Sequence, residues 1–226
     1  MEVVMKDFAA IIFDMDGTIV QTENIWREAS ERLLSKSTLE IAPEKRQELY
    51  DRSHGLAMKE TCLLIKEYGQ LHESIDELII EKKRIAQELY DRGISFIPGF
   101  PEFHQHISAA NLKSGVATNA DEHTLNTTNR VMNLSQFFGE HLYSIASVNN
   151  RCKPHPDIYL YVADKLQVNP RDCMAVEDSA HGIAAAKAAG MWCIGINTSN
   201  DLNQLREADV IISSYHGINL NTLKKR

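Results

Sequence analysis

The sequence predicts an α/β fold in which a parallel sheet is covered by helices and carries a helical insertion near its start. Short segments rich in Val and Ile recur along the chain and suit buried strands. Helix-like stretches separate the later segments, and this alternation favours a parallel sheet covered on both faces. One long interval, from about residue 22 to residue 92, shows helical spacing and no convincing strand. At 226 residues the chain is long enough to bury a substantial core.

The first expected strand, Ala9 to Phe13, ends on two aspartates that are one residue apart. Side chains alternate along an extended chain, so Asp14 and Asp16 emerge on the same side, and Gly17 lets the backbone turn away behind them. Two carboxylates this close repel each other unless a cation, a proton or a phosphoryl group relieves the repulsion. The pair therefore indicates a metal held beside a nucleophile, and the alternative is a surface turn with solvated acids.

The interval after this motif predicts an all-helical insertion. Its apolar stripes at helical spacing are Ile25, Ala29 and Leu33, and then Ile75, Leu78, Ile79, Ala86 and Leu89. The turn signal Ile97-Pro98-Gly99 restarts the β/α pattern, so we expect a cap domain over 21–94 and a core made of 1–20 and 95–226. An insertion rooted beside the acidic motif can act as a lid that excludes water and selects substrate; a bundle that only adds stability is the alternative.

The later part of the chain predicts four more strands and at least one clear helix. The alanine-rich stretch from Ala180 to Ala189 suits a helix, with Ser179 placed to cap its start and Gly190 its end. The strands are expected at Ser114 to Ala117, Met174 to Val176, Trp192 to Ile196 and Val210 to Ile212.

Polar residues follow several of these strands, and ligands of open parallel sheets bind at the carboxyl ends of strands. Thr118 and Asn119 follow one strand and can bind phosphate oxygens. Lys153 precedes two prolines in RCKPHPDIY, which keep the chain extended and hold the lysine in a defined place, where a fixed cation would neutralise phosphate and carboxylate charge. The strand MAVEDS ends on Glu177 and Asp178, which point to opposite faces, so we expect one to contact a metal and the other to act through water. An all-oxygen ligand set suits Mg²⁺.

The composition excludes some classes of partner. A formal net charge of −7 with scattered basic residues argues against a nucleic-acid surface or a basic membrane patch. The four cysteines show no CxxC spacing, and no apolar run approaches the roughly 20 residues of a membrane span. The start of the chain lacks the pattern of a secretory signal. We therefore expect a cytoplasmic protein with reduced thiols, no nucleic-acid or membrane partner, and a monomeric state.

Taken in order, these motifs resemble a known family. DxDGT at 14–18, Thr-Asn at 118–119, Lys-Pro at 153–154 and Glu-Asp at 177–178 are similar to the four signature motifs of the haloacid dehalogenase superfamily of phosphohydrolases. The resemblance spans nearly the whole chain and includes the helical cap, as in the subfamily of sugar-phosphate phosphatases and β-phosphoglucomutase. It implies a Rossmann-like parallel sheet core with an inserted all-helical cap domain, acting on a small phosphorylated metabolite.

The resemblance also implies a role for each motif residue. Asp14 would be the nucleophile that forms an aspartyl-phosphate, and Asp16 the general acid and base. Mg²⁺ would be held by Asp14, the main-chain carbonyl of Asp16 and Asp178, with Glu177 as the outer partner of the metal. The residues that bind the phosphate and absorb its charge would be Thr118, Asn119 and Lys153, and Lys153 counts among the catalytic residues as well.

Substrate choice is expected to depend on the cap. The segment from Asp51 to Lys59 resembles the cap loop that faces the substrate in relatives, which makes Arg52, His54 and Lys59 candidate substrate contacts. β-Phosphoglucomutases carry a histidine at the position of Trp26, so the resemblance favours a phosphatase over a β-phosphoglucomutase-like phosphotransferase. Hexose phosphates, phosphoglycolate and nucleotide-like phosphates all remain candidate substrates.

Three other readings of the motifs stay open at this point. A hydrolytic dehalogenase of the same superfamily would need no metal and would lack the acids at Asp16 and Asp178. A phosphoryl-receiving signalling domain also clusters aspartates, Thr and Lys on a parallel sheet, but it is smaller and lacks a helical insertion. A non-catalytic binding protein on the same fold is the third reading, although every catalytic position is filled here.

Overall fold

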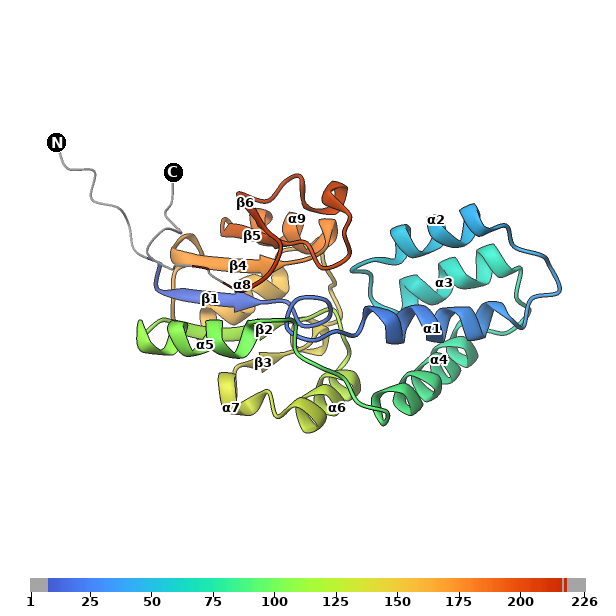
Figure 1. The fold of residues 1–226 in the computed structure, drawn as a ribbon, viewed down its shortest axis with the longest axis horizontal. Helices are drawn as coiled ribbons and strands as arrows, with labels where there is room; N and C mark the ends of the chain where they lie inside the picture. Colours follow the sequence, from blue (N-terminus) through green and yellow to red (C-terminus); the bar gives the residue numbers. More distant parts are fainter. Residues whose placement is uncertain (1–7, 217, 219–226) are drawn as a thin grey trace. The chain divides into compact units, whose positions relative to one another are not determined.

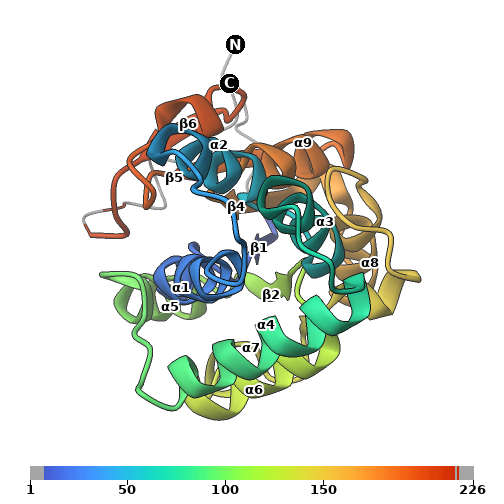
Figure 2. The same cartoon turned by 90° about the vertical axis from the view of Figure 1, so that its right-hand side faces the viewer.

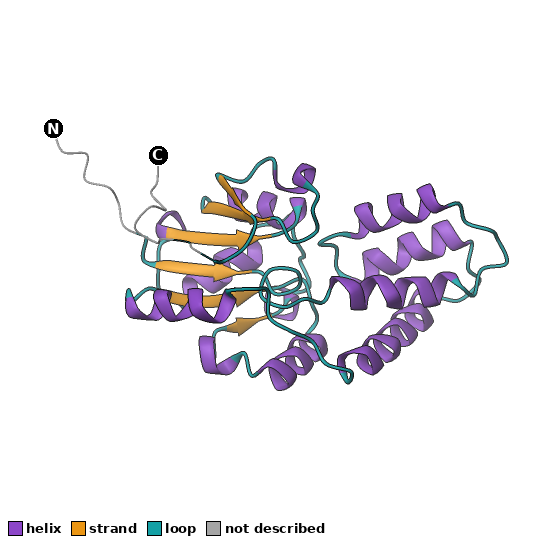
Figure 3. Cartoon of the chain, in the orientation of Figure 1, coloured by secondary structure: helices purple, strands orange, loops and turns teal. Residues whose placement is uncertain are grey.

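The computed structural model describes residues 8–216 and residue 218 (Figure 1). Its contacts divide the chain into two compact units: residues 22–94 form one, and residues 1–21 together with 95–226 form the other. All named strands belong to the larger unit, and four helices make up the smaller one (Figure 3).

The larger unit is built on a six-stranded sheet in the order β3-β2-β1-β4-β5-β6, and every strand pair is parallel. The strands are β1 (Ala10–Phe13), β2 (Lys113–Ala117), β3 (Leu142–Tyr143), β4 (Cys173–Glu177), β5 (Trp192–Ile196) and β6 (Val210–Ile212). The predicted α/β fold with a parallel sheet is confirmed. The sequence pattern missed β3, because two residues are too few to show any periodicity.

Alternating residues of β1 contribute to two separate cores, one on each face of the sheet. Ile11 and Phe13 pack in the cluster that holds residues of α5, α6 and α7, whereas Ala10 and Ile12 pack with residues of α8 and α9 (Figure 1). These helices are α5 (Phe100–Ala109), α6 (Glu122–Met132), α7 (Ser135–Phe138), α8 (Asp157–Lys165) and α9 (Ala180–Ala188). Short 3₁₀ turns complete the unit at η1 (Ile145–Val148), η2 (Pro170–Asp172) and η3 (Leu202–Leu205). Since both faces are covered, strands as apolar as β1 can be buried throughout.

The smaller unit is a bundle of four helices, α1 (Glu23–Leu34), α2 (Pro43–Ser53), α3 (Met58–Gly69) and α4 (Ile75–Tyr90). Helix α4 packs on α1 and α3, and α2 packs on α3 (Figure 2). The predicted apolar stripes form its core, in which Ile25, Ala29 and Leu33 are buried. Helix α4 begins with a capping box: the Ser74 hydroxyl accepts from the Glu77 N–H, and the Glu77 carboxylate accepts from the Ser74 N–H.

Across the part of the chain that the structure describes, no helix is both long and apolar enough to cross a membrane. None of the four cysteines, all of which lie in the described part of the chain, forms a disulfide, and Cys62, Cys173 and Cys193 are buried.

Candidate active site

The motif residues meet at the carboxyl ends of three neighbouring strands. Asp14 follows β1, and Thr118 and Asn119 follow β2. Glu177 is the last residue of β4, and Asp178 follows it. Strand β1 lies between β2 and β4 in the sheet, so these strand ends are adjacent. The Asp14 N–H donates to the Val176 carbonyl at 3.0 Å, which ties the end of β1 to β4.

Three buried carboxylates form an acidic cluster of Asp14, Glu177 and Asp178, with one oxygen of each lying within 4.8 Å of the others. Burial raises the pKa of Asp14 well above its usual value; Lys153 opposes this rise, while Glu177 and Asp178 add to it. One lysine, Lys153, cannot offset the charge of three buried carboxylates; a divalent cation would offset the remainder, and the hard carboxylate oxygen atoms suit Mg²⁺. The acidic cluster does not include the side chain of Asp16, which is half-buried in the turn after Asp14.

Lys153 is the buried cation of the site, with 3 % of its surface exposed. Its Nζ donates to Asp14 Oδ1 at 2.6 Å and to Glu177 Oε1 at 2.5 Å. Burial alone would lower the pKa of Lys153, but the charges of Asp14 and Glu177 outweigh it and the net shift is upward. The Asn119 side chain accepts from the Lys153 N–H at 2.9 Å, so this amide also fixes the lysine backbone.

The carboxylate of Glu177 is fully buried and faces protein donors on both oxygens. Its Oε1 accepts from the Tyr159 hydroxyl at 2.6 Å as well as from Lys153, and its Oε2 accepts from the Ser179 hydroxyl at 3.2 Å. Gly182 lies directly against this group, because a Cβ atom there would stand 1.9 Å from the Glu177 carboxyl carbon. Helix α9 therefore needs glycine at this position.

Asp178 rests on the turn that follows Asp14. Gly17 has φ +76°, and a Cβ atom on it would lie 2.0 Å from Asp178 Oδ2, so both its backbone conformation and its surroundings require glycine. The Thr18 hydroxyl donates to Asp178 Oδ1 at 3.4 Å. Two hydroxyls from the end of the chain brace the turn: Thr198 donates to the Gly17 carbonyl at 2.8 Å, and Tyr215 donates to the Thr18 carbonyl at 2.9 Å.

The structure thus brings together Asp14, Asn119, Lys153, Glu177 and Asp178. Thr118 is buried, and its hydroxyl accepts from the Ala120 N–H at 3.0 Å.

The candidate cap residues belong to the helical unit. Arg52 donates to the Tyr68 hydroxyl at 2.9 Å; His54 follows α2, and Lys59 is exposed on α3. A substrate role for Arg52, His54 and Lys59 stays a prediction.

Sequence reasoning missed three supporting residues, Tyr159, Ser179 as a partner of Glu177, and Tyr215. Tyr159 and Ser179 stand inside or beside motif segments, yet tyrosine in a helix reads as core and serine before a helix reads as a cap. The signal that could have found Tyr159 and Ser179 was the presence of a hydroxyl group in or beside an apolar stretch close to a motif.

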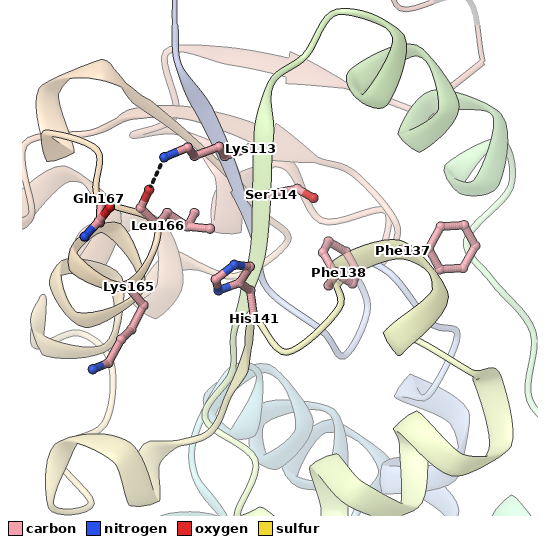
Figure 4. Close-up of a pocket in the computed structure, with 8 residues that line it drawn as sticks. All are labelled: Lys113, Ser114, Phe137, Phe138, His141, Lys165, Leu166 and Gln167. Carbon is pink, nitrogen blue, oxygen red and sulfur yellow. Dashed lines mark hydrogen bonds between the residues drawn. The ribbon is translucent and has the colours of Figure 1, made fainter.

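A separate cavity of about 400 Å³ lies at the opposite end of β2, where that strand begins (Figure 4). Its lining includes Lys113, Ser114, Phe137, His141, Lys165 and Gln167, and Lys113 Nζ donates to the Leu166 carbonyl at 2.7 Å (Figure 4). None of the predicted site residues lines it. The chemistry of the motifs therefore belongs to the strand ends around Asp14.

Comparison with known proteins identifies the class. Residues 8–190 match the family model of haloacid dehalogenase-like hydrolases. The chain therefore belongs to the haloacid dehalogenase-like hydrolases and is an enzyme of the hydrolase class, as its motifs predict.

Individual relatives match over nearly the full chain. A phosphorylated carbohydrates phosphatase of Thermotoga maritima is 28 % identical over 222 residues, covering 96 % of this chain and 98 % of the relative. The β-phosphoglucomutase of Bacillus subtilis is 26 % identical over 225 residues, covering 95 % of this chain and 93 % of the relative. Among solved structures, CbbY from Rhodobacter sphaeroides in complex with phosphate matches with a TM-score of 0.76 and 25 % identity, covering 92 % of this chain and 95 % of that one.

Proposed function

We propose that this enzyme is a Mg²⁺-dependent phosphatase that hydrolyses a small phosphorylated metabolite through an aspartyl-phosphate on Asp14. The observation that carries the proposal is the pairing of Asp14 Oδ1 with Lys153 Nζ at 2.6 Å inside a buried acidic cluster. A carboxylate beside a fixed cation at the ends of parallel strands suits attack on an anionic phosphoryl group.

The reaction would proceed in two displacements. A carboxylate oxygen of Asp14 attacks phosphorus, and the bond from phosphorus to the leaving alkoxide oxygen breaks while Asp16 gives that oxygen a proton. Asp16 then takes a proton from water, whose oxygen attacks the aspartyl-phosphate and releases inorganic phosphate and free Asp14. Lys153 neutralises negative charge at Asp14 throughout, while Thr118 and Asn119 bind phosphate oxygens.

The residues of the acidic cluster fit a magnesium ion. Asp14, Asp178 and the main-chain carbonyl of Asp16 would hold it, and Glu177 would remain its outer partner, because both Glu177 oxygens already accept from protein donors. When bound, the ion would neutralise phosphoryl charge and orient the substrate.

A phosphorylated sugar is the substrate class that we infer, since a relative that matches over nearly the whole chain acts on phosphorylated carbohydrates. The candidate contacts to the sugar are Arg52, His54 and Lys59 of the helical unit, which would act as a cap over the site. The cytoplasmic location and the monomeric state also remain proposals.

Replacement Asp14→Asn tests the assignment of the nucleophile. Turnover of a panel of phosphorylated metabolites with Mg²⁺ should fall below detection, because the amide is a poor nucleophile. The fold should persist, since Lys153 keeps its contact with Glu177. Circular dichroism and the melting temperature provide the control, and a variant that keeps wild-type activity would refute the proposal.

The same assay addresses the second candidate function, a β-phosphoglucomutase-like phosphotransferase. The similarity to the Bacillus subtilis enzyme favours this candidate. Formation of glucose 6-phosphate from glucose 1-phosphate without net release of inorganic phosphate would identify a mutase. We expect inorganic phosphate as the main product instead, because Trp26 stands where mutases carry a histidine.

A further inference from the structure

We propose that Tyr159 is a positioning residue for catalysis: its hydroxyl directs the Glu177 carboxylate onto Lys153, which leaves the metal to Asp14 and Asp178. This inference rests on the proposed function for its kinetic part. Its metal-binding part depends only on the geometry of the site.

The geometry around Glu177 Oε1 is the first observation. Tyr159 lies in α8 and is fully buried, and its hydroxyl donates to this oxygen at 2.6 Å. Lys153 Nζ donates to the same oxygen at 2.5 Å. Two donors, one in the loop before α8 and one in α8 itself, therefore converge on one acceptor, and the tyrosine fixes where the lysine meets its second carboxylate.

Tyr159 also contacts the lysine itself. The Lys153 ammonium lies 4.9 Å from the centre of the Tyr159 ring, within the range of a cation–π contact. The tyrosine thus touches both members of the ion pair, with its ring against the cation and its hydroxyl against the anion. A phenylalanine at this position would supply the ring contact only, without the hydrogen bond to Glu177.

The remaining surroundings leave Glu177 few other positions. Its Oε2 accepts from the Ser179 hydroxyl, and Gly182 lies so close that even a methyl group there would collide with the carboxyl group. In the direction of the acidic cluster, oxygens of Asp14 and Asp178 lie within 4.8 Å of an oxygen of Glu177. Without the Tyr159 hydroxyl, we expect the carboxylate to turn in that direction.

Tyr159→Phe is the direct test, because it keeps the ring and removes only the hydroxyl. We expect kcat to fall roughly tenfold with KM changed less than about twofold, since Lys153 loses precise placement rather than charge. We also expect Mg²⁺ to bind the substrate-free protein about threefold more tightly or better, as Glu177 becomes an additional oxygen ligand. Calorimetric titration with MgCl₂ measures the second effect without any substrate.

Tyr161→Phe is the matched control, because Tyr161 lies on the same helix and packs against Tyr143 away from Glu177. Its kcat and Mg²⁺ affinity should equal those of the wild type. A folded Tyr159→Phe protein with unchanged kcat and unchanged Mg²⁺ affinity would overturn the inference, and so would a loss of melting temperature alone.

If the Tyr159→Phe protein does not fold, Glu177→Gln tests the inference in its place. We expect kcat to fall at least about tenfold, and Mg²⁺ affinity to fall clearly less than in Asp178→Asn, because Glu177 acts through Lys153 and not as a ligand. A weakened Mg²⁺ affinity of the kind that follows the loss of a ligand would refute the inference. If the wild-type protein hydrolyses no phosphoester, the proposed function fails, yet the Mg²⁺ titrations still test the role of Tyr159.

Discussion

Gly182 determines whether the Glu177 carboxylate can occupy its position. It lies in the first turn of α9, where the Ser179 hydroxyl accepts from its N–H at 3.1 Å. The carboxyl carbon of Glu177 would be 1.9 Å from a Cβ atom at this residue. Since Glu177 holds Lys153, a change of one hydrogen atom for a methyl group reaches Asp14, the proposed nucleophile, through two contacts.

Gly182→Ala is therefore expected to destabilise the protein, although Gly to Ala in a helix usually stabilises by about 0.5–1 kcal/mol. Overpacking against Glu177 should cost roughly 1–3 kcal/mol of unfolding free energy. Phosphatase activity should fall as well. Urea unfolding measures the first effect; Ala184→Gly, at an exposed position of the same helix, measures helix propensity alone. A stabilised Gly182→Ala variant would contradict the crowding.

Helix α4 carries an unusual buried cation. Lys82 is only 3 % exposed within the core of the helical unit, and its Nζ lies 5.9 Å from the centre of the Trp26 ring. Burial lowers the pKa of Lys82 to about 8, and the nearby Cys62 raises it only in part. The charged form of this lysine therefore opposes the folding of the helix bundle.

Because the pKa of Lys82 differs between the folded and unfolded states, the stability of the protein depends on pH in a definite direction. In the unfolded chain Lys82 titrates near its ordinary pKa of 10.5, and in the folded protein near 8. Between these values the unfolded state binds more protons, so stability rises with pH across this window. Below pH 8 the penalty is fully present, roughly 3 kcal/mol for a shift of this size.

Lys82→Met should accordingly raise the free energy of unfolding at pH 7, by as much as roughly 3 kcal/mol. The gain should shrink as pH rises from 8 toward 10.5, because the wild-type lysine then loses its charge. Thermal melts across this pH range provide the measurement. Lys45→Met, at an exposed position of α2, should leave stability nearly unchanged. A pH-independent gain would indicate better packing instead of lost charge.

The whole α/β unit is needed to assemble the acidic cluster. Asp14 follows β1, Glu177 ends β4, and Lys153 comes from the segment before α8, so the unfolded chain holds no such group. An ion that binds only the folded cluster must stabilise the folded state by mass action. Metal binding at this cluster would therefore be coupled to global stability.

Mg²⁺ should raise the melting temperature of the wild-type protein, and a chelator should reverse the effect and abolish turnover. At about 100 times its Kd the ion would contribute roughly 2.7 kcal/mol. Asp178→Asn should lose most of the response, whereas Asp164→Asn, at an exposed position of α8, should keep it. Equal shifts in both variants would mean that the ion binds elsewhere.

The residue order alone predicts much of this protein. Val- and Ile-rich segments predict the parallel sheet, and helical spacing predicts the insertion, since periodicity is a local property of the chain. Acids placed after strands, and a lysine in a segment between strands, predict the cluster around Asp14, because parallel strands end at one edge of a sheet. The pattern missed β3, whose two residues show no period.

The partners of individual side chains depended on tertiary structure. Tyr159 lies in the apolar segment DIYLYV, which suggests a core residue. Its contact with Glu177 arises only when α8 packs against β1 and β2. Lys82 stands in the charged run EKKR and reads as solvated, yet the bundle buries it. Sequence spacing determines which face of an element is apolar, whereas the opposing surface, and hence each polar contact, is decided only when distant segments pack together.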